Sequence, residues 1–250
     1  MSALVATDLS GSAIVPRGQS PQLWASLQAI LAAHDRSESI RVLDCGGGSG
    51  SLAVPLAAQG AQVTVVDVSI DALSTLLRRA IEADVADRVT AVQGEAESLT
   101  ELVPTAHFDL VLAHEVFDDM ASLSVGLQQV TAALCPGGVA SVVVGNPVAV
   151  VIGRALAGDV SGAVSALHRI APHGFNLGKL GEQCRSAGLD VLSVDGLGVF
   201  TELVPGIELE RPGAMIALTE LEAATAAMAP FRDIASRLHI MARRPSASGT

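Results

Sequence analysis

The sequence has little of what a membrane-spanning protein or a broad nucleic-acid binder needs. Tyrosine is absent and aromatic residues make up 2% of the 250 residues, so few side chains are available to stack on bases. The net charge is −11 and no acidic block accounts for it, which argues against a broad nucleic-acid footprint and suits a soluble protein. The uncharged, largely apolar run at residues 139–153 is broken by Gly145-Asn146-Pro147 and is too short to span a bilayer. We therefore expect neither DNA nor a membrane as a partner.

Cysteine is also scarce, and this bears on compartment and on metal binding. Cys45, Cys135 and Cys184 are scattered, with neither disulfide nor zinc-site spacing. We expect no metal site and a reducing, cytoplasmic environment. The N-terminus shows no basic segment followed by an apolar run, so no secretory signal is expected.

What the sequence does have is a glycine-rich turn. Residues 42–50 read Val-Leu-Asp-Cys-Gly-Gly-Gly-Ser-Gly, which predicts the end of a buried strand and a tight turn before a helix at 52–59. Glycine is needed where φ is positive or where a ligand touches bare backbone, and such a turn aims free N–H groups at that ligand. Ser51 stands where the dinucleotide-binding fingerprint requires its third glycine. An ordinary tight turn is the alternative interpretation.

Apolar runs alternate with helical patterns along the rest of the chain, which predicts an α/β fold. Strands are expected at 62–66, 88–93, 108–114, 139–144, 189–194 and 238–242, and helices at 21–33, 70–83, 123–134, 176–187 and 212–227. The second strand ends at Asp67, where an acid can accept hydrogen bonds from ribose hydroxyls in S-adenosylmethionine or in NAD. The alternative for Asp67 is an N-cap for the next helix, a role that Ser69 fills equally well.

His114 falls at the tip of the strand at 108–114, the edge at which ligands of open α/β sheets bind. It could line the cofactor pocket, orient a substrate or act as a general base, and a structural role is the alternative. Glu115 and Asp118 or Asp119 are weaker candidates just after the same tip.

Residues 148–175 follow the fifth strand and are expected to form an inserted cap of short helices. Between residues 151 and 185 the basic side chains exceed the acidic ones by two. The excess indicates either helix charges that face solvent or, more specifically, a receptor for an anionic substrate. We expect residues 1–15 to be mobile, 16–245 to form one domain and 246–250 to be a polar tail.

The glycine turn resembles the first motif of the class I S-adenosylmethionine-dependent methyltransferases. Phe-Asp-Leu-Val at 108–111, Leu-Cys-Pro-Gly-Gly at 134–138 and a last strand after a long connection are similar to features of the same family. The resemblance implies a Rossmann-like, mostly parallel seven-stranded sheet with an antiparallel last strand and helices on both faces. It also implies S-adenosyl-L-methionine as cofactor and S-adenosyl-L-homocysteine as product.

Within that family the chain is most similar to the bacterial tRNA 5-carboxymethoxyuridine methyltransferases, over residues 17–245. The resemblance places Gly46, Gly47, Asp67, Ala96 and His114 at cofactor positions. The whole expected cofactor site comprises Arg17, Asp44, Gly46, Gly47, Gly48, Gly50, Asp67, Val68, Glu95, Ala96 and His114. The expected substrate-binding residues are Asn146, Arg154, Arg169 and Arg237.

Two departures from the subfamily weaken the case for tRNA as the substrate. Residues 166–173 replace its lysine-rich stretch and its Tyr-Pro-Arg segment, and Arg17 is displaced from its N-terminal arginine. The expected activity is methyl transfer to a carboxylate or hydroxyl oxygen of a small molecule or a modified tRNA nucleoside, with His114 as the base for a hydroxyl. An NAD-dependent oxidoreductase and a cofactor-binding protein without chemistry are the alternatives.

Overall fold

The computed structural model describes residues 15–16, 19–35, 37–117, 120–170 and 177–246. The predictions of a mobile segment at 1–15 and a polar tail at 246–250 therefore fall almost wholly outside the described residues. Arg17, Asp118 and Asp119 lie outside them as well.

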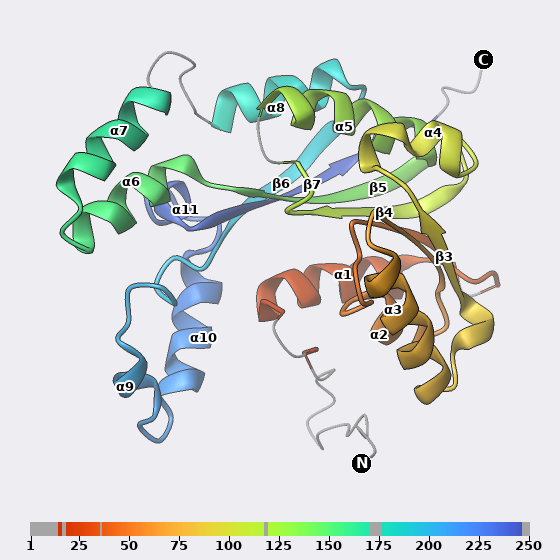
Figure 1. The fold of residues 1–250 in the computed structure, drawn as a ribbon, viewed down its shortest axis with the longest axis horizontal. Coiled ribbons are helices and arrows are strands. Elements are labelled where there is room, and N and C mark those ends of the chain that lie inside the picture. Colours follow the sequence, from red (N-terminus) through yellow and green to blue (C-terminus); the bar gives the residue numbers. More distant parts are fainter. Residues whose placement is uncertain (1–14, 17–18, 36, 118–119, 171–176, 247–250) are drawn as a thin grey trace.

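Seven strands form one sheet in the order β3-β2-β1-β4-β5-β7-β6 (Figure 1). Their bounds are β1 Arg41–Cys45, β2 Gln62–Asp67, β3 Val89–Gln93, β4 Phe108–His114, β5 Leu134–Gly145, β6 Asp190–Leu197 and β7 Arg237–Arg243. The pairs from β3 to β5 are parallel, whereas β7 is antiparallel to both β5 and β6. The predicted fold class is confirmed, and the last strand lies between β5 and β6. The strand order reverses between β1 and β4, which is where open α/β sheets bind ligands.

The connections are helical. The helices are α1 Pro21–Ala33, α2 Ala53–Ala58, α3 Ile70–Glu82, α4 Leu99–Leu102, α5 Met120–Ala133, α6 Pro147–Leu156, α7 Val160–Ile170, α8 Leu177–Ser186, α9 Gly206–Leu209, α10 Ala214–Thr225 and α11 Phe231–Ile234. Ser20 caps α1, and Ser69 caps α3 by accepting a hydrogen bond from the N–H of Ala72 at 3.2 Å. The capping role of Ser69 is thereby confirmed, and the Asp67 carboxylate is left for another role.

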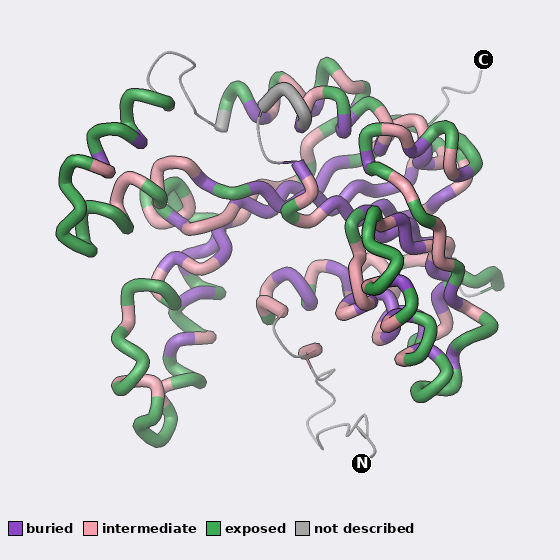
Figure 2. The backbone as a smooth tube through the Cα atoms, in the orientation of Figure 1, coloured by how far each residue is buried: buried purple, intermediate pink, exposed green. Residues whose placement is uncertain are grey.

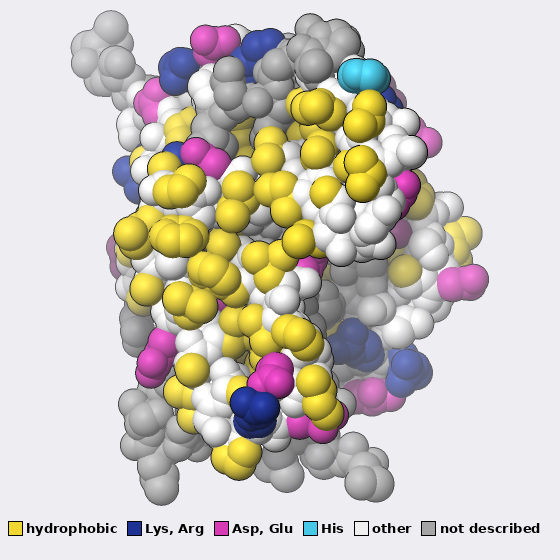
Figure 3. Space-filling view, turned by 90° about the vertical axis from the view of Figure 1, so that its left-hand side faces the viewer, with side chains coloured by type: hydrophobic (Ala, Val, Ile, Leu, Met, Phe, Trp, Pro, Cys, Tyr) yellow, Lys and Arg dark blue, Asp and Glu magenta, His cyan; other side chains and the backbone are white. Residues whose placement is uncertain are grey.

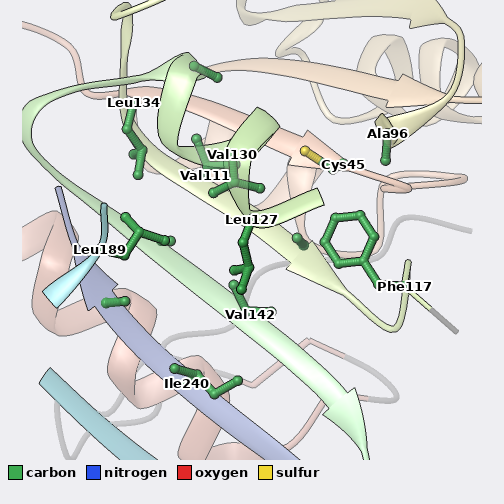
Figure 4. Packing of buried hydrophobic residues seen from close by; sticks show 14 of the residues in the cluster. Cys45, Ala96, Val111, Phe117, Leu127, Val130, Leu134, Val142, Leu189 and Ile240 are labelled. Atoms are coloured by element: carbon green, nitrogen blue, oxygen red, sulfur yellow. The ribbon is translucent and has the colours of Figure 1, made fainter. Parts of the chain in front are cut away.

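Apolar side chains from the two faces of the sheet form two cores, and the strands between them are buried (Figure 2). On one face, side chains of α1, α2 and α3 such as Trp24, Leu56 and Leu76 pack on β1, β2 and β4. On the other, α4, α5 and α8 cover Val111, Val142 and their neighbours (Figure 4). Burial of these faces is the main driving force that holds the helices on the sheet.

The structure corrects the start of the fifth strand. The turn predicted at 135–138 lies inside β5, where the pairing with β4 shifts from Phe108–Leu134 to Leu110–Val139. The extra residues bulge out of the ladder, and Gly137 adopts the left-handed φ of +85° that this bend requires. The turn chemistry was read correctly, but its local pairing with β4 could not be seen in the sequence.

The segment predicted as a cap forms α6 and α7, which pack on each other beyond the end of β5 (Figure 1). This side of the molecule gathers exposed apolar side chains over α6, α7, α9 and α10 (Figure 3). They include Val150, Leu156, Val160, Val164, Leu167, Ile207, Met215 and Ile216. Within the described ranges, no helix is both long and apolar enough to cross a membrane.

Candidate active site

The glycine turn between β1 and α2 depends on backbone conformations that other residues rarely adopt. Gly46, Gly48 and Gly50 have φ of +66°, +53° and +78°. Gly47 has an ordinary φ, but a Cβ there would lie 2.5 Å from the Cγ of Asp44. The turn therefore needs glycine at four positions, for two different reasons.

Gly50 has a packing reason to be glycine, and its predicted contact with a cofactor stays a prediction. A Cβ at Gly50 would lie 2.3 Å from the Cδ1 of Leu76 on α3, and its N–H donates to the carbonyl of Gly47 at 2.9 Å. Gly50 is buried under α3, so it holds that helix against the turn. At Gly48 the position of a Cβ is open, and its nearest neighbour is an Asp67 oxygen at 3.8 Å.

Asp44 ends up as a buried carboxyl group beneath the turn. It is 3% exposed, and among the described residues its side chain has no hydrogen-bond partner. Burial, with a smaller contribution from the charge of Asp67, raises the pKa of Asp44 to about 7. A cation bound beside it would remove that penalty by pairing with the carboxylate.

Asp67, at the tip of β2, braces the turn from the side. Its Oδ2 accepts a hydrogen bond from the N–H of Gly48 and its Oδ1 accepts one from the N–H of Ser69, both at 2.8 Å. Each carboxylate oxygen has a second lone pair, so both can still accept a hydroxyl. Sequence reasoning placed Asp67 correctly at the strand tip but missed its bond to the turn.

The remaining predicted cofactor residues follow the tips of β2 and β3. Val68 and Glu95 are exposed, whereas Ala96 is buried. They continue the edge that starts at the glycine turn, because β3, β2, β1 and β4 are successive parallel strands. Their contact with a cofactor stays a prediction.

A cavity of about 220 Å³ lies at the tips of β1 and β4. Its walls come from the turn, the start of α1, β4, β5 and β7. The lining residues are Gln19, Ser20, Leu23, Asp44, Cys45, Gly46, Gly47, Ser51, Leu52, His114, Glu115, Val143, Leu197 and Arg237. It thus brings together Asp44, Gly46, Gly47, His114 and Arg237 from the predicted set.

His114 contributes a neutral imidazole to this cavity. Its Nε2 is hydrogen-bonded to the Oγ of Ser141 at 2.9 Å, while Nδ1 is buried without a partner. Burial, and then the charge of His239, lower the pKa of His114 to about 3. The ring is therefore uncharged at neutral pH, as a proton acceptor must be.

Glu115 and Arg237 face each other at the cavity. The Arg237 Nη1 donates to the Glu115 Oε1 at 3.2 Å, and both side chains are about half exposed. Glu115 has a φ of +56°, a strained value for a residue with a side chain and one found preferentially at functional sites. This ion pair is weak enough to exchange for a substrate group.

Asn146 has a structural role, and its predicted contact with a substrate stays a prediction. Its amide nitrogen donates to the carbonyls of Asp233 and Ala235 at 3.0 and 2.8 Å, and its Oδ1 caps α6 through the N–H of Val148. The side chain is 1% exposed. With its donors and acceptor all used, Asn146 fastens α6 to the segment before β7.

Arg154 and Arg169, the predicted receptors for an anionic substrate, lie on α6 and α7 outside the cavity. Arg154 pairs with Asp159 at 2.9 Å and thereby braces the turn between the two helices. Arg169 is exposed near the end of α7. No described residue of either helix lines the cavity. The ion pair with Asp159 gives Arg154 a structural role, and substrate binding by Arg154 and Arg169 stays a prediction.

Several residues of the site were missed. Gln19, Ser20 and Ser51 line the cavity through the start of α1 and the turn, and Ser141 and His239 stand behind His114. The last two carried a signal, because each is a polar residue inside an otherwise apolar strand, at a position that alternation predicts to be buried.

Comparisons with known proteins agree with this geometry. Residues 43–140 match the family described as "Methyltransferase domain". The chain is 26% identical to the tRNA 5-carboxymethoxyuridine methyltransferase of Escherichia coli (strain K12), over 89% of this chain and 87% of that protein. It is 36% identical to a ubiquinone biosynthesis O-methyltransferase of Bradyrhizobium diazoefficiens over 40% of this chain and 37% of that one.

A solved structure shares the fold. The phosphoethanolamine N-methyltransferase 2 of Haemonchus contortus in complex with S-adenosyl-L-methionine matches with a TM-score of 0.59 and 20% identity, over 94% of this chain and 54% of that one. The match to the methyltransferase family and the named relatives favour methyl transfer over the two alternatives. The chain is an S-adenosylmethionine-dependent methyltransferase of the class I fold, with its family-matched domain at residues 43–140.

Proposed function

We propose that the protein transfers the methyl group of S-adenosyl-L-methionine to an oxygen atom of a small molecule or of a modified tRNA nucleoside. The observation that carries this proposal is the cavity in which the glycine turn, a neutral His114 and the guanidinium of Arg237 meet. The relatives named for carboxymethoxyuridine and ubiquinone methylation support an oxygen acceptor.

The residues present fit the cofactor. When bound, S-adenosyl-L-methionine supplies a methyl group activated by a positively charged sulfur. Asp44 would hold the ammonium group of its methionine part, because a buried, unpartnered carboxylate gains most from a cation. Gly46 and Gly47 would let the cofactor approach the backbone, and Asp67 would accept the ribose hydroxyls with its free lone pairs.

The other cofactor contacts are proposed on position alone. Val68, Glu95 and Ala96 would border the adenine at the tips of β2 and β3, and Arg17 would meet the cofactor carboxylate.

The acceptor would enter beside His114, Glu115 and Arg237. A carboxylate is already nucleophilic and needs only a cation, which Arg237 offers by exchanging its bond to Glu115. A hydroxyl needs a base, and the neutral His114 ring can take its proton. Proximity and alignment in a shielded site supply the rest of the catalysis.

We further propose that residues 16–245 act as one methyltransferase domain, in which 148–175 would serve as a cap. The single sheet to which all seven strands belong supports this view. The location of α6 and α7 beyond β5 would require the cap to move before it reaches the cavity.

The test uses purified protein, S-adenosyl-L-methionine with a labelled methyl group and fractionated cell extract, with and without its tRNA. We expect label in one fraction, attached to oxygen. Mild alkali separates the two acceptor classes, because a methyl ester releases its label as methanol and a methyl ether does not. The matched control is protein with Gly48→Val, which should transfer no label; label on nitrogen or carbon would refute the proposal.

A further inference from the structure

Polar side chains cross the sheet behind His114 on one face. Val143 of β5 stands opposite His114 of β4 and opposite His239 of β7, and Asp195 of β6 stands opposite His239. Ser141 lies two residues before Val143 and so points to the same face. Four neighbouring strands therefore carry His114, Ser141, His239 and Asp195 in a row.

Hydrogen bonds join the first three of these groups. The Ser141 Oγ lies 2.9 Å from the Nε2 of His114 and 2.8 Å from the Nε2 of His239. Ser141 is 0% exposed, and in the described part of the chain its hydroxyl has no other partner. A hydroxyl has one hydrogen, so to be satisfied it donates to one ring and accepts from the other.

The charge of Asp195 sets which group donates and which accepts in these hydrogen bonds. Burial lowers the pKa of His239 to about 4, and the charge of Asp195, which stands opposite it on β6, acts against that shift and favours a proton on the ring. Both residues line a second cavity of about 310 Å³ between α1 and α10. Since Nε2 of His239 is bonded to Ser141, Nδ1 is the ring nitrogen on which the charge of Asp195 would favour a proton. A proton held there leaves Nε2 of the neutral ring as an acceptor for the Ser141 hydroxyl.

The remaining assignments follow. The Ser141 hydroxyl donates its hydrogen bond to Nε2 of His239, so its oxygen accepts a hydrogen bond from the Nε2–H of His114. The neutral His114 ring then carries a lone pair on Nδ1, the buried nitrogen that has no partner. We propose that Asp195, acting through His239 and Ser141, fixes the tautomer of His114 so that Nδ1 accepts the proton of the methyl acceptor.

This inference rests on the proposed function and narrows the acceptor to a hydroxyl. The acceptor's O–H bond breaks as its oxygen forms the bond to the methyl carbon, and the proton goes to Nδ1 of His114. The methyl carbon–sulfur bond breaks with its electron pair left on sulfur, so the products are the methyl ether and S-adenosyl-L-homocysteine. Asp195, His239 and Ser141 are positioning residues, because they act through His114.

The decisive experiment reads the tautomer without catalysis. Long-range proton–nitrogen spectra of protein labelled with ¹⁵N-histidine distinguish protonated from bare ring nitrogens, and His114→Gln and His239→Gln assign the signals. We expect a bare Nδ1 and a protonated Nε2 for His114 in the wild type. Asp195→Asn should shift His114 toward the opposite tautomer, and Asp190→Asn, the same change at an exposed position of β6, should not.

Kinetics then connect the tautomer to turnover. Asp195→Asn should lower kcat for the hydroxyl acceptor by roughly tenfold, with S-adenosyl-L-homocysteine affinity unchanged. Ser141→Ala, which interrupts the chain at a small side chain, should reproduce the loss. A protonated Nδ1 in wild-type His114, an unchanged spectrum in Asp195→Asn or an alkali-labile ester as product would each overturn the inference.

Failure of the proposed function looks different. A protein that transferred no methyl group to any fraction would refute the activity, while the tautomer of the ligand-free protein would still be read directly. A protein that methylates oxygen but carries the opposite tautomer would refute this inference alone.

Discussion

The half of the sheet from β1 to β3 and the half from β5 to β7 build their functional features by different means. In the first, the glycine turn is set by backbone conformation, with three positive φ values within five residues. In the second, side chains distant in sequence make the structure. Glu222 on α10 is a clear case: it is 6% exposed and accepts hydrogen bonds from the N–H groups of Val199, Phe200 and Thr201 and from the Thr201 hydroxyl, at 2.8–2.9 Å.

The difference predicts how each half fails. In a site built from backbone, a side chain added where the ligand touches the backbone should block binding. The conformational strain that it adds is confined to the turn. A site held by long-range side-chain bonds loses folding stability when one anchor is removed, because several buried polar groups lose their partner together. The following substitutions test this contrast in order of expected effect.

Gly48→Val should cause the largest loss. A valine would adopt the left-handed φ of +53° at a cost of about 1–2 kcal/mol and would project beside Asp67, where the ribose is proposed to lie. We expect S-adenosyl-L-homocysteine affinity to fall roughly 100-fold or more by calorimetry. Gly60→Val is the matched control, because Gly60 has a φ of +98° with nothing within 4 Å; equal losses in both variants would show that strain alone is responsible.

Glu222→Ala should cost about 3 kcal/mol of unfolding free energy, since it leaves the three N–H groups of residues 199–201 without their charged acceptor. For a domain of this size that corresponds to a Tm lower by roughly 6–12 °C. Thermal unfolding followed by circular dichroism measures it. Glu220→Ala, on the exposed side of the same helix, should leave the Tm within about 1 °C.

Acid should weaken cofactor binding through Asp44. Its raised pKa of about 7 means that the carboxyl group is half ionised at pH 7 and almost fully protonated at pH 5.5. If the ammonium of the cofactor pairs with the ionised form, as proposed, affinity should fall roughly 15-fold between these values, about 1.6 kcal/mol. Titration calorimetry at both values checks this, and Asp44→Asn should bind weakly and lose the pH dependence; a dependence that survives in the variant must come from another group.

Arg154→Ala should have the smallest effect. The ion pair with Asp159 is 46% and 49% exposed, and such pairs contribute about 0–1 kcal/mol. We expect the Tm and the kinetic constants for the methyl acceptor to change little. A large rise in KM would instead restore Arg154 as a substrate receptor and show that α6 approaches the cavity.

The same contrast explains what the sequence could predict. The strands as far as β4, the glycine turn and the positions of Asp67 and His114 at strand tips follow from periodicity and from the glycines, because both signals are local. Gly50 was assigned to the ligand because glycine tells that a side chain is excluded, not whether α3 or a cofactor excludes it. The structural role of Asn146 could not be predicted because its partners lie 87–89 residues away, at Asp233 and Ala235.

Ser141 and His239 show the limit most clearly. Each is visible as a polar residue in an apolar strand, yet 98 residues separate them and only the insertion of β7 beside β5 brings them together. Their link to His114 could not be predicted without the strand order.

The location of β7 also has a consequence during synthesis. Among the described strands β6 pairs with β7 alone, so it cannot join the sheet until residues 237–243 have left the ribosome. Until then the nascent chain would also expose the free edge of β5, and an exposed strand edge can form non-native pairs with a neighbouring chain. The half of the sheet from β5 to β7 can therefore complete its fold only after β7 has been synthesised.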